Sequence, residues 1–121
     1  MKDVKERKSK LTPGLFLELY TLGYIISKNT EVYGKEILDE IATCNTVWNP
    51  SHGTFYPVIN NMLKENLIRY AYEADSKKYY EITEEGKEYY NIRAKVFKDM
   101  LLQTSNFYEN VAKTLPQGTI I

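Results

Sequence analysis

The sequence has few of the residues that build disulfides, metal sites or membrane spans. Its 121 residues contain one cysteine, Cys44, and one histidine, His52, which excludes an internal disulfide framework and a Cys/His zinc site. No apolar run approaches the ~20 residues that a membrane-spanning helix needs. Residues 1–10 lack the apolar stretch of a signal peptide. We therefore expect one cytoplasmic domain in a reducing compartment, with no membrane partner.

Catalytic groups are also missing. The chain has no glycine-rich phosphate loop, no paired-carboxylate constellation and no Ser/His/Asp set. A lone histidine with no Cys, Asp or second His nearby does not make a catalytic or metal centre, so His52 is assigned to a helix N-terminus or a phosphate contact. The expectation is a protein that is not an enzyme and that uses no metal or cofactor.

Net charge is absent overall but unevenly distributed. Sixteen Lys and Arg balance sixteen Asp and Glu, while residues 1–10 carry a net charge of +3 and residues 11–50 a net charge of −3. Residues 1–11 therefore form a basic N-terminal arm, which is either a solvated terminus or a tail that contacts phosphates. Eleven tyrosines suit core edges, interfaces and stacking surfaces equally, because each joins an apolar ring to a polar tip.

Helix signals fill the first half of the chain. Thr12 and Pro13 combine a hydroxyl N-cap with a first-turn proline, and the segment 15–26 that follows is apolar nearly all round, as in a core helix. Apolar spacing predicts a second helix over 33–43. A third helix, capped by a hydroxyl at residue 51 or 54, is predicted to run to about residue 65.

A hairpin and a long helix fill the second half. The strand-like stretches 67–74 and 77–82 are separated by a short polar turn, which predicts a β-hairpin. Thr83 then caps a helix that meets no breaker until Pro116, a length of about 45 Å. The predicted fold is mainly α with a small β-hairpin (α+β). In this order the elements form a winged helix-turn-helix followed by a long C-terminal dimerisation helix.

The last helix, 83–115, is too long to lie entirely on the core formed by the residues before it. It carries two apolar stripes, and its far half needs a partner other than its own core, most simply a second copy of the chain. The alternative is a single helix that curls back over the core. The residues expected at the dimer interface are Phe97, Met100, Leu101, Phe107, Tyr108 and Val111.

Three blocks of the sequence resemble the PadR-like transcriptional regulators. Residues 51–68 are similar to the family's recognition-helix signature and contain Gly53-Thr54-Phe55-Tyr56-Pro57. Residues 78–86 are similar to the end of its wing, and residues 33–37 to the start of its second helix. The match spans roughly residues 12 to 115. It departs from the family pattern at four positions, Tyr33, Lys35, Asn66 and Lys78.

The resemblance implies a domain organisation for the chain. Residues 12–82 would form the DNA-binding domain, residues 83–115 the dimerisation helix and residues 116–121 a tail. With one helix after the wing, the chain is similar to the short subfamily, in which that helix dimerises. The resemblance implies a dimeric, sequence-specific repressor released by a small hydrophobic or phenolic effector between the paired helices. Tight packing without a ligand is the alternative there.

The DNA contacts are expected from those side chains of the third helix that do not belong to its core face. Their hydroxyls, amides and one lysine can reach phosphates and base edges, and the wing adds positive charge. The expected DNA-binding residues are Ser51, His52, Thr54, Tyr56, Asn60, Asn61, Lys64, Lys77, Lys78 and Tyr79. The alternative function is a winged-helix protein-interaction module that does not bind DNA.

Two single residues remain. Cys44 ends an amphipathic helix and is expected to be a small buried hydrophobe, with a redox sensor as the alternative. Trp48 lies in the turn-rich connection 45–51. It is expected to pack beneath that connection rather than to stack on a ligand.

Overall fold

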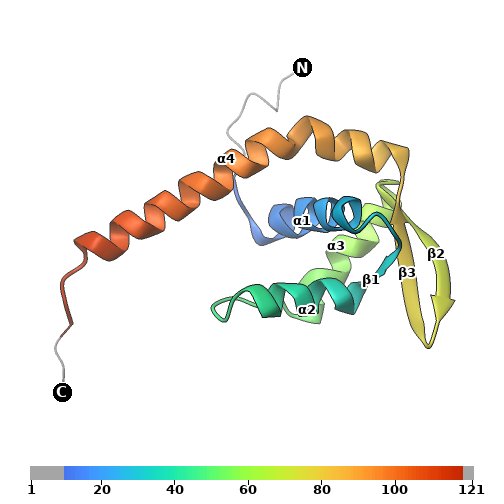
Figure 1. Ribbon diagram of the computed structural model, residues 1–121, viewed down its shortest axis with the longest axis horizontal. Coiled ribbons are helices and arrows are strands. Elements are labelled where there is room, and N and C mark those ends of the chain that lie inside the picture. The colour runs from blue at the N-terminus through green and yellow to red at the C-terminus, as the bar shows by residue number, and fades with distance from the viewer. Residues whose placement is uncertain (1–9, 119–121) are drawn as a thin grey trace.

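The computed structural model describes residues 10–118, and within them it contains four helices and one three-stranded antiparallel sheet (Figure 1). Most of the basic arm and the last three residues of the tail lie outside the described residues. The elements are α1 (Pro13–Lys28), β1 (Val32–Tyr33), α2 (Gly34–Cys44), α3 (His52–Lys64), β2 (Ile68–Ala74), β3 (Lys77–Ile82) and α4 (Glu84–Thr114). The predicted mainly α fold is confirmed.

Side-chain caps define the helix ends. The hydroxyl oxygen of Thr12 accepts a hydrogen bond from the Leu15 amide at 3.1 Å, which supplies one of the partners that a helix start lacks. Asn29 ends α1 in the left-handed conformation with φ 58°. Ser51 caps α3 through the Thr54 amide. The boundaries predicted from hydroxyl caps and breakers are thus confirmed.

The hairpin gains a third strand that the sequence did not predict. β1 pairs antiparallel with β3, with Val32 opposite Tyr80, so the strand order is β1-β3-β2. The turn between β2 and β3 consists of Asp75 and Ser76, whose φ angles are 53° and 65°. Positive φ at both positions matches the right-handed twist of the flanking strands. Asp tolerates this conformation better than most residues.

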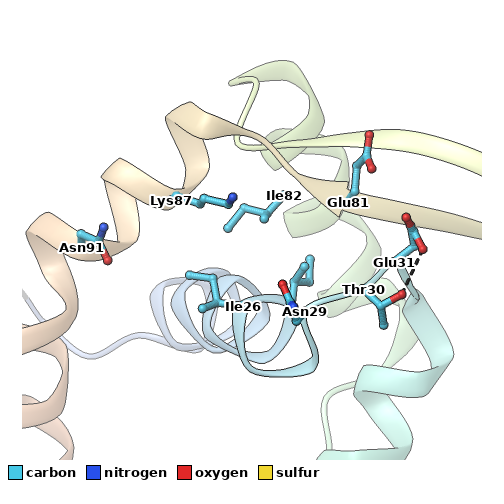
Figure 2. A pocket seen from close by; sticks show the side chains of 9 residues that line it. Ile26, Asn29, Thr30, Glu31, Glu81, Ile82, Lys87 and Asn91 are labelled. Carbon is cyan, nitrogen blue, oxygen red and sulfur yellow. Dashed lines mark hydrogen bonds between the residues drawn. The ribbon is translucent and has the colours of Figure 1, made fainter.

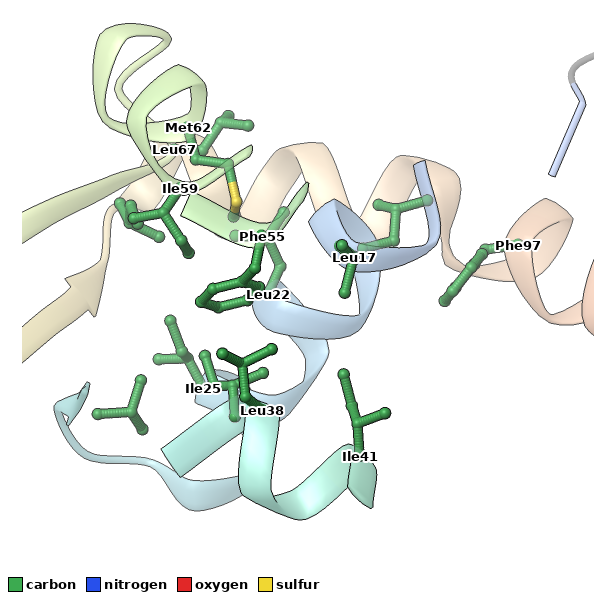
Figure 3. Packing of buried hydrophobic residues seen from close by; sticks show 14 residues of the cluster. Leu17, Leu22, Ile25, Leu38, Ile41, Phe55, Ile59, Met62, Leu67 and Phe97 are labelled. Atoms are coloured by element: carbon green, nitrogen blue, oxygen red, sulfur yellow. The ribbon is translucent and has the colours of Figure 1, made fainter. Parts of the chain in front are cut away.

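The core lies where the first three helices meet the sheet (Figure 3). Phe55, in the first turn of α3, is fully buried and fixes that helix to the rest of the domain. Burying such a side chain contributes about 2–3 kcal/mol from apolar transfer alone. The other buried hydrophobic residues are Leu17, Leu19, Leu22, Ile25, Val32, Ile37, Leu38, Ile41, Ile59, Met62, Leu67, Ile68 and Phe97.

Thr83 joins α4 to the rest of the domain. Its side chain is buried, and its hydroxyl donates toward the carbonyl oxygens of Asn66 at 2.6 Å and Leu67 at 3.0 Å. The same oxygen accepts a hydrogen bond from the Gly86 amide at 2.9 Å. A Cβ at Gly86 would collide with the Leu67 carbonyl. One hydroxyl therefore ties together the segment after α3, the approach to β2 and the start of α4.

The first half of α4 packs on α1, and the second half extends beyond the core (Figure 1). Tyr89 donates its hydroxyl to Glu18 of α1 at 2.6 Å, and Phe97 lies 6.1 Å from the Phe16 ring. Tyr108, by contrast, is 65% exposed, so the helix does not curl back over its own core. Neither α4 nor any other helix in residues 10–118 is long and apolar enough to cross a bilayer.

Cys44 is exposed, and its prediction as a buried hydrophobe is wrong. It occupies the last position of α2, one turn beyond the buried Ile41, where no neighbouring element covers the helix. Its Sγ lies 3.6 Å from a carboxylate oxygen of Glu40. Partial desolvation and this carboxylate raise the pKa of the thiol, which lowers its thiolate fraction and its reactivity at neutral pH.

Candidate nucleic-acid interface

Helix α3 has a buried face and a free face. Phe55, Ile59 and Met62 point into the core, at the spacing of an amphipathic helix. Asn60 and Lys64 are exposed on the free side. An amide and an ammonium on an uncovered helix face are suitable chemistry for base edges and phosphates.

The N-terminus of α3 is exposed and rich in hydroxyls. The Ser51 hydroxyl accepts from the Thr54 amide at 3.2 Å and donates to the Thr54 hydroxyl oxygen at 3.2 Å. Ser51 therefore caps the helix, while Thr54 remains solvent-exposed on its first turn. Because a helix start combines unpaired amides with the positive end of the dipole, it attracts anions such as phosphate.

Tyr56 is held in place by its neighbours. Its ring meets His52 edge-on at 5.4 Å and Phe55 edge-on at 5.1 Å. A Cβ at Gly34 would lie 3.0 Å from the Tyr56 ring, so glycine at residue 34 gives the Tyr56 side chain room beside the start of α2. Tyr56 is half-buried and presents a positioned hydroxyl rather than a mobile one.

A groove of about 360 Å³ lies beside Tyr56. The start of α2 and the hairpin form its other walls, so three elements that are distant in the sequence meet there. Burial, and then the nearby Tyr56, raises the pKa of the Tyr80 hydroxyl, which keeps it protonated as a hydrogen-bond donor. The groove is lined by Tyr33, Gly34, Lys35, Tyr56, Ser76, Lys77, Lys78 and Tyr80.

Three lysines give the groove its positive charge. Lys35 forms an ion pair with Asp39 at 2.9 Å, which raises the pKa of Lys35. Lys77 lies 5.3 Å above the Tyr33 ring, in a cation–π geometry. Within residues 10–118, neither Lys77 nor Lys78 is ion-paired with a carboxylate. Two wing lysines are thus available to phosphates at one edge of the groove.

Two predicted residues lie outside this arrangement. Tyr79 is stacked at 4.8 Å on Tyr72 and meets Tyr33 edge-on at 5.3 Å, on the opposite side of β3 from Lys78. It is not part of the groove lining. Asn61 lines a separate groove with the first turns of α1, including Glu18.

The sequence missed the part that α2 plays in the groove. Gly34 and Lys35 belong to the third block of the family resemblance, which is the signal that could have identified them. Their position next to Tyr56 depends on how α2 and α3 pack, and no local pattern encodes that packing. The packing of α2 against α3 therefore adds Lys35 and the backbone at Gly34 to the surface formed by the predicted DNA-binding residues.

The predicted dimerisation residues fall into two groups along α4. Phe97 is 5% exposed in its own core, and Met100, Leu101 and Val111 are half-buried. Phe107 and Tyr108 are more than 60% exposed, with ring centroids 5.8 Å apart. Further large apolar side chains exposed along this helix and just after its end are Ile92, Val96, Leu102 and Leu115.

Trp48 contacts α1. Its ring meets Phe16 edge-on at 5.5 Å, and Phe16 is in turn stacked on Tyr20 and close to Phe97. The prediction that Trp48 packs near its own connection is confirmed in part, because 38% of the side chain remains exposed. The contact also brings Trp48 into the aromatic cluster that reaches α4.

Comparisons with known proteins give one consistent result. Residues 22–92 match the family model described as the transcriptional regulator PadR-like family. A PadR-like transcriptional regulator from Bacillus cereus is 33% identical, with 86% of this chain and 94% of that chain covered and a TM-score of 0.55. No match was found among curated proteins.

Two further solved structures share the fold at lower identity. A transcriptional regulator from Clostridium thermocellum is 22% identical, with 76% of this chain and 89% of that chain covered and a TM-score of 0.62. A PadR family transcription regulator from Clostridium difficile is 21% identical, with 77% and 98% covered and a TM-score of 0.60. The winged-helix arrangement is therefore common to all three.

Proposed function

The chain belongs to the transcriptional regulator PadR-like family, and we propose that it is a dimeric repressor that binds a specific double-stranded DNA operator. The observation that carries the proposal is the groove in which α2, α3 and the hairpin converge around Tyr56 and two wing lysines. Residues 12–82 bind DNA, and residues 83–115 pair two chains. Figure 1 supports this division, because the hairpin tip and the free end of α4 lie at opposite ends of the molecule.

In this proposal α3 enters the major groove, as recognition helices of this class do. Asn60 and Lys64 contact base edges from its free face, with Asn suited to adenine. Tyr56 donates its hydroxyl to a backbone phosphate, and Lys77 and Lys78 bind phosphates along the wing. His52, Ser51 and Thr54 contribute to the phosphate contacts at the start of α3. Tyr79 and Asn61 have weaker support, because Tyr79 packs against Tyr33 and Tyr72 and Asn61 lies in a separate groove beside α1.

Dimerisation is supported by the apolar surface of the far half of α4. Phe107 and Tyr108 form an exposed aromatic pair, and Leu102 is 65% exposed close to it. Surfaces of this kind at a helix end are typically covered by another chain. In a two-fold dimer, this surface of one chain would pack against the same surface of a second copy. Two α3 helices related by that axis would read two half-sites about 34 Å apart.

We place the proposed small aromatic effector not between the paired helices but in a separate groove between α1 and α4 of one chain. This groove, of about 310 Å³, is lined partly by the rings of Tyr20, Tyr24, Tyr90 and Phe97. A flat hydrophobic or phenolic compound stacked there would change how α4 lies on α1. Release from DNA requires that the compound bind the free form more tightly than the DNA-bound form. Calorimetry with planar cationic and phenolic compounds tests this, and affinities weaker than about millimolar for every compound would contradict it.

The DNA proposal is tested by selecting bound fragments from a random DNA library and measuring their affinity as salt is varied. Replacing Lys77 and Lys78 by Ala should weaken binding to all sequences and lower the slope of log affinity against log salt by up to roughly two. Lys28→Ala, on α1 outside the groove, is the matched control and should leave the slope unchanged. Failure of the wild-type chain to bind any DNA at low salt would favour the alternative, a winged-helix module that binds protein.

A further inference from the structure

A second cavity lies on a different side of the domain from the DNA groove and shares no lining residue with it. It has a volume of about 450 Å³ and lies between the end of α1, the approach to β1, the end of β3 and the first turns of α4 (Figure 2). Sites for small molecules typically have volumes of about 300–1,000 Å³. Nothing in the proposed contacts with DNA or with a second chain uses it.

The floor of this cavity is apolar. Ile25 is buried, Ile82 is half-buried, and Ile26 is 37% exposed. In Figure 2 Ile26 and Ile82 come from opposite sides, one from α1 and one from the end of β3. An apolar group on this floor would remove exposed surface of Ile26 and Ile82 from water, which favours its binding.

The polar rim is negatively charged once its ion pairs are accounted for. Glu81 accepts a hydrogen bond from Arg69 at 2.6 Å, and Lys87 lies 3.4 Å from a carboxylate oxygen of Glu84. Glu31 accepts a hydrogen bond from the Thr30 hydroxyl at 3.0 Å, and no lysine or arginine of residues 10–118 pairs with it. The one carboxylate left without a cation is therefore that of Glu31.

We propose that this cavity binds a small organic amine with an apolar body. The ammonium group donates to the Glu31 carboxylate and to the side-chain oxygen of Asn29, and the body lies on the three isoleucines. Asn29 ends α1 in the left-handed conformation and lines the cavity, so its side-chain oxygen is an acceptor within the same site as Glu31. An anion is disfavoured, because Glu31 and Glu81 lie together at the sheet end of the cavity (Figure 2).

The location of the cavity makes such an amine a regulator. Ile82 and Lys87, on its two sides, flank the buried Thr83 that joins the sheet to α4. A ligand that touches both elements favours one angle between them, to the extent that it binds that arrangement more tightly than others. Amine binding would thereby couple to the geometry of the C-terminal helix without contact to DNA.

The test uses three probes that share one body and differ in charge: phenethylamine, 2-phenylethanol and 3-phenylpropanoate. Calorimetry on the full chain without DNA should give submillimolar affinity for the amine, at least tenfold weaker binding for the alcohol and no measurable binding for the carboxylate. Glu31→Gln should weaken amine binding at least tenfold and bring it level with the alcohol. Because DNA is absent, this result is independent of the DNA-binding proposal.

Glu73→Gln, an exposed position on β2 outside the cavity, is the matched control and should leave amine affinity unchanged. Ile26→Ala, which removes part of the partly exposed floor, should weaken the amine about fivefold, and it keeps the test decisive if Glu31→Gln does not fold. Equal affinities of the wild-type chain for amine and alcohol would overturn the proposal. So would absence of amine binding at millimolar concentration, or equal losses in Glu31→Gln and Glu73→Gln.

Discussion

The two halves of α4 belong to one continuous helix but have opposite surroundings. In the first half, Phe97 is 5% exposed against α1, while in the second half Phe107, of the same residue type, is 62% exposed. Residue type does not distinguish them, and neither does helix face alone, because Tyr108, eleven residues after Phe97 and on nearly the same face, is 65% exposed. What differs is the element opposite each residue. The first half completes a core, and the second half is a surface that residues 10–118 leave largely exposed.

The largest effect is expected from Phe97→Ala. Truncating a buried aromatic ring removes apolar contact and leaves a cavity, so unfolding free energy should fall by about 3–5 kcal/mol. Urea unfolding followed by Trp48 fluorescence measures it. Phe107→Ala is the control from the other half, and it should change unfolding by less than about 0.5 kcal/mol once extrapolated to monomer. Equal losses in both variants would remove the distinction between the halves.

Phe107→Asp tests whether the second half of α4 forms a dimer interface. A carboxylate buried without a partner between two chains costs about 3 kcal/mol or more, so the dimer dissociation constant should rise at least about a hundredfold. Sedimentation over a concentration series measures this shift. Asn106→Asp adds the same charge at the neighbouring polar position and should change dimerisation by less than about threefold. A wild-type chain that is monomeric at micromolar concentration would show the dimer proposal to be wrong.

Gly86→Ala tests how closely the start of α4 packs against the backbone at Leu67. The added methyl group would collide with the Leu67 carbonyl, which is backbone and cannot rotate away, so unfolding free energy should fall by about 1–3 kcal/mol. Gly14→Ala, where a Cβ meets nothing within 4 Å, should be neutral or stabilising by up to about 1 kcal/mol. Thermal unfolding of both variants gives the answer. A tolerated Gly86→Ala would mean that α4 starts more loosely than described.

Tyr89→Phe should have the smallest effect, a loss of about 1 kcal/mol from the hydrogen bond to Glu18. Burial and that carboxylate raise the pKa of Tyr89 to about 12. Because the folded-state pKa is raised, the hydroxyl contributes fully below about pH 10 and its contribution is lost as pH rises through about 12. The stability difference between wild type and Tyr89→Phe should therefore shrink across that range. Urea unfolding at pH 8, 10 and 11 checks the trend, and a difference that grows with pH would contradict it.

Much of the fold could be predicted, because its elements begin and end at residues with local chemistry. Thr12 and Thr83 cap α1 and α4 at the predicted positions, and Ser51, one of the two predicted alternatives, caps α3. β1 could not be predicted in this way. Two residues carry no period, and Val32 and Tyr33 are extended only because β3 lies beside them.

The site was less predictable, because it depends on contacts between distant segments. Helical spacing from Ile41 predicts that Cys44 is buried, but α2 ends at this residue and leaves its side chain exposed. The wing motif groups Lys78 with Tyr79, although the alternation of a strand sends their side chains to opposite faces. Gly34 meets Tyr56 only after two helices have packed. Local pattern thus located the elements, while packing decided which of their side chains share a surface.

The hydroxyl of Thr83, which is hydrogen-bonded to three backbone segments, fixes the point from which α4 extends. Because one buried oxygen contacts the backbone after α3, before β2 and at the start of α4, a change in the direction of α4 would also shift the backbone that follows α3. The 31 residues of α4 make an arm of about 46 Å, so a tilt of 5° at the joint displaces its far end by about 4 Å. In the proposed dimer, where the free ends are paired, a small change of tilt at the joint would therefore change the separation of the two proposed DNA-binding domains by several ångströms.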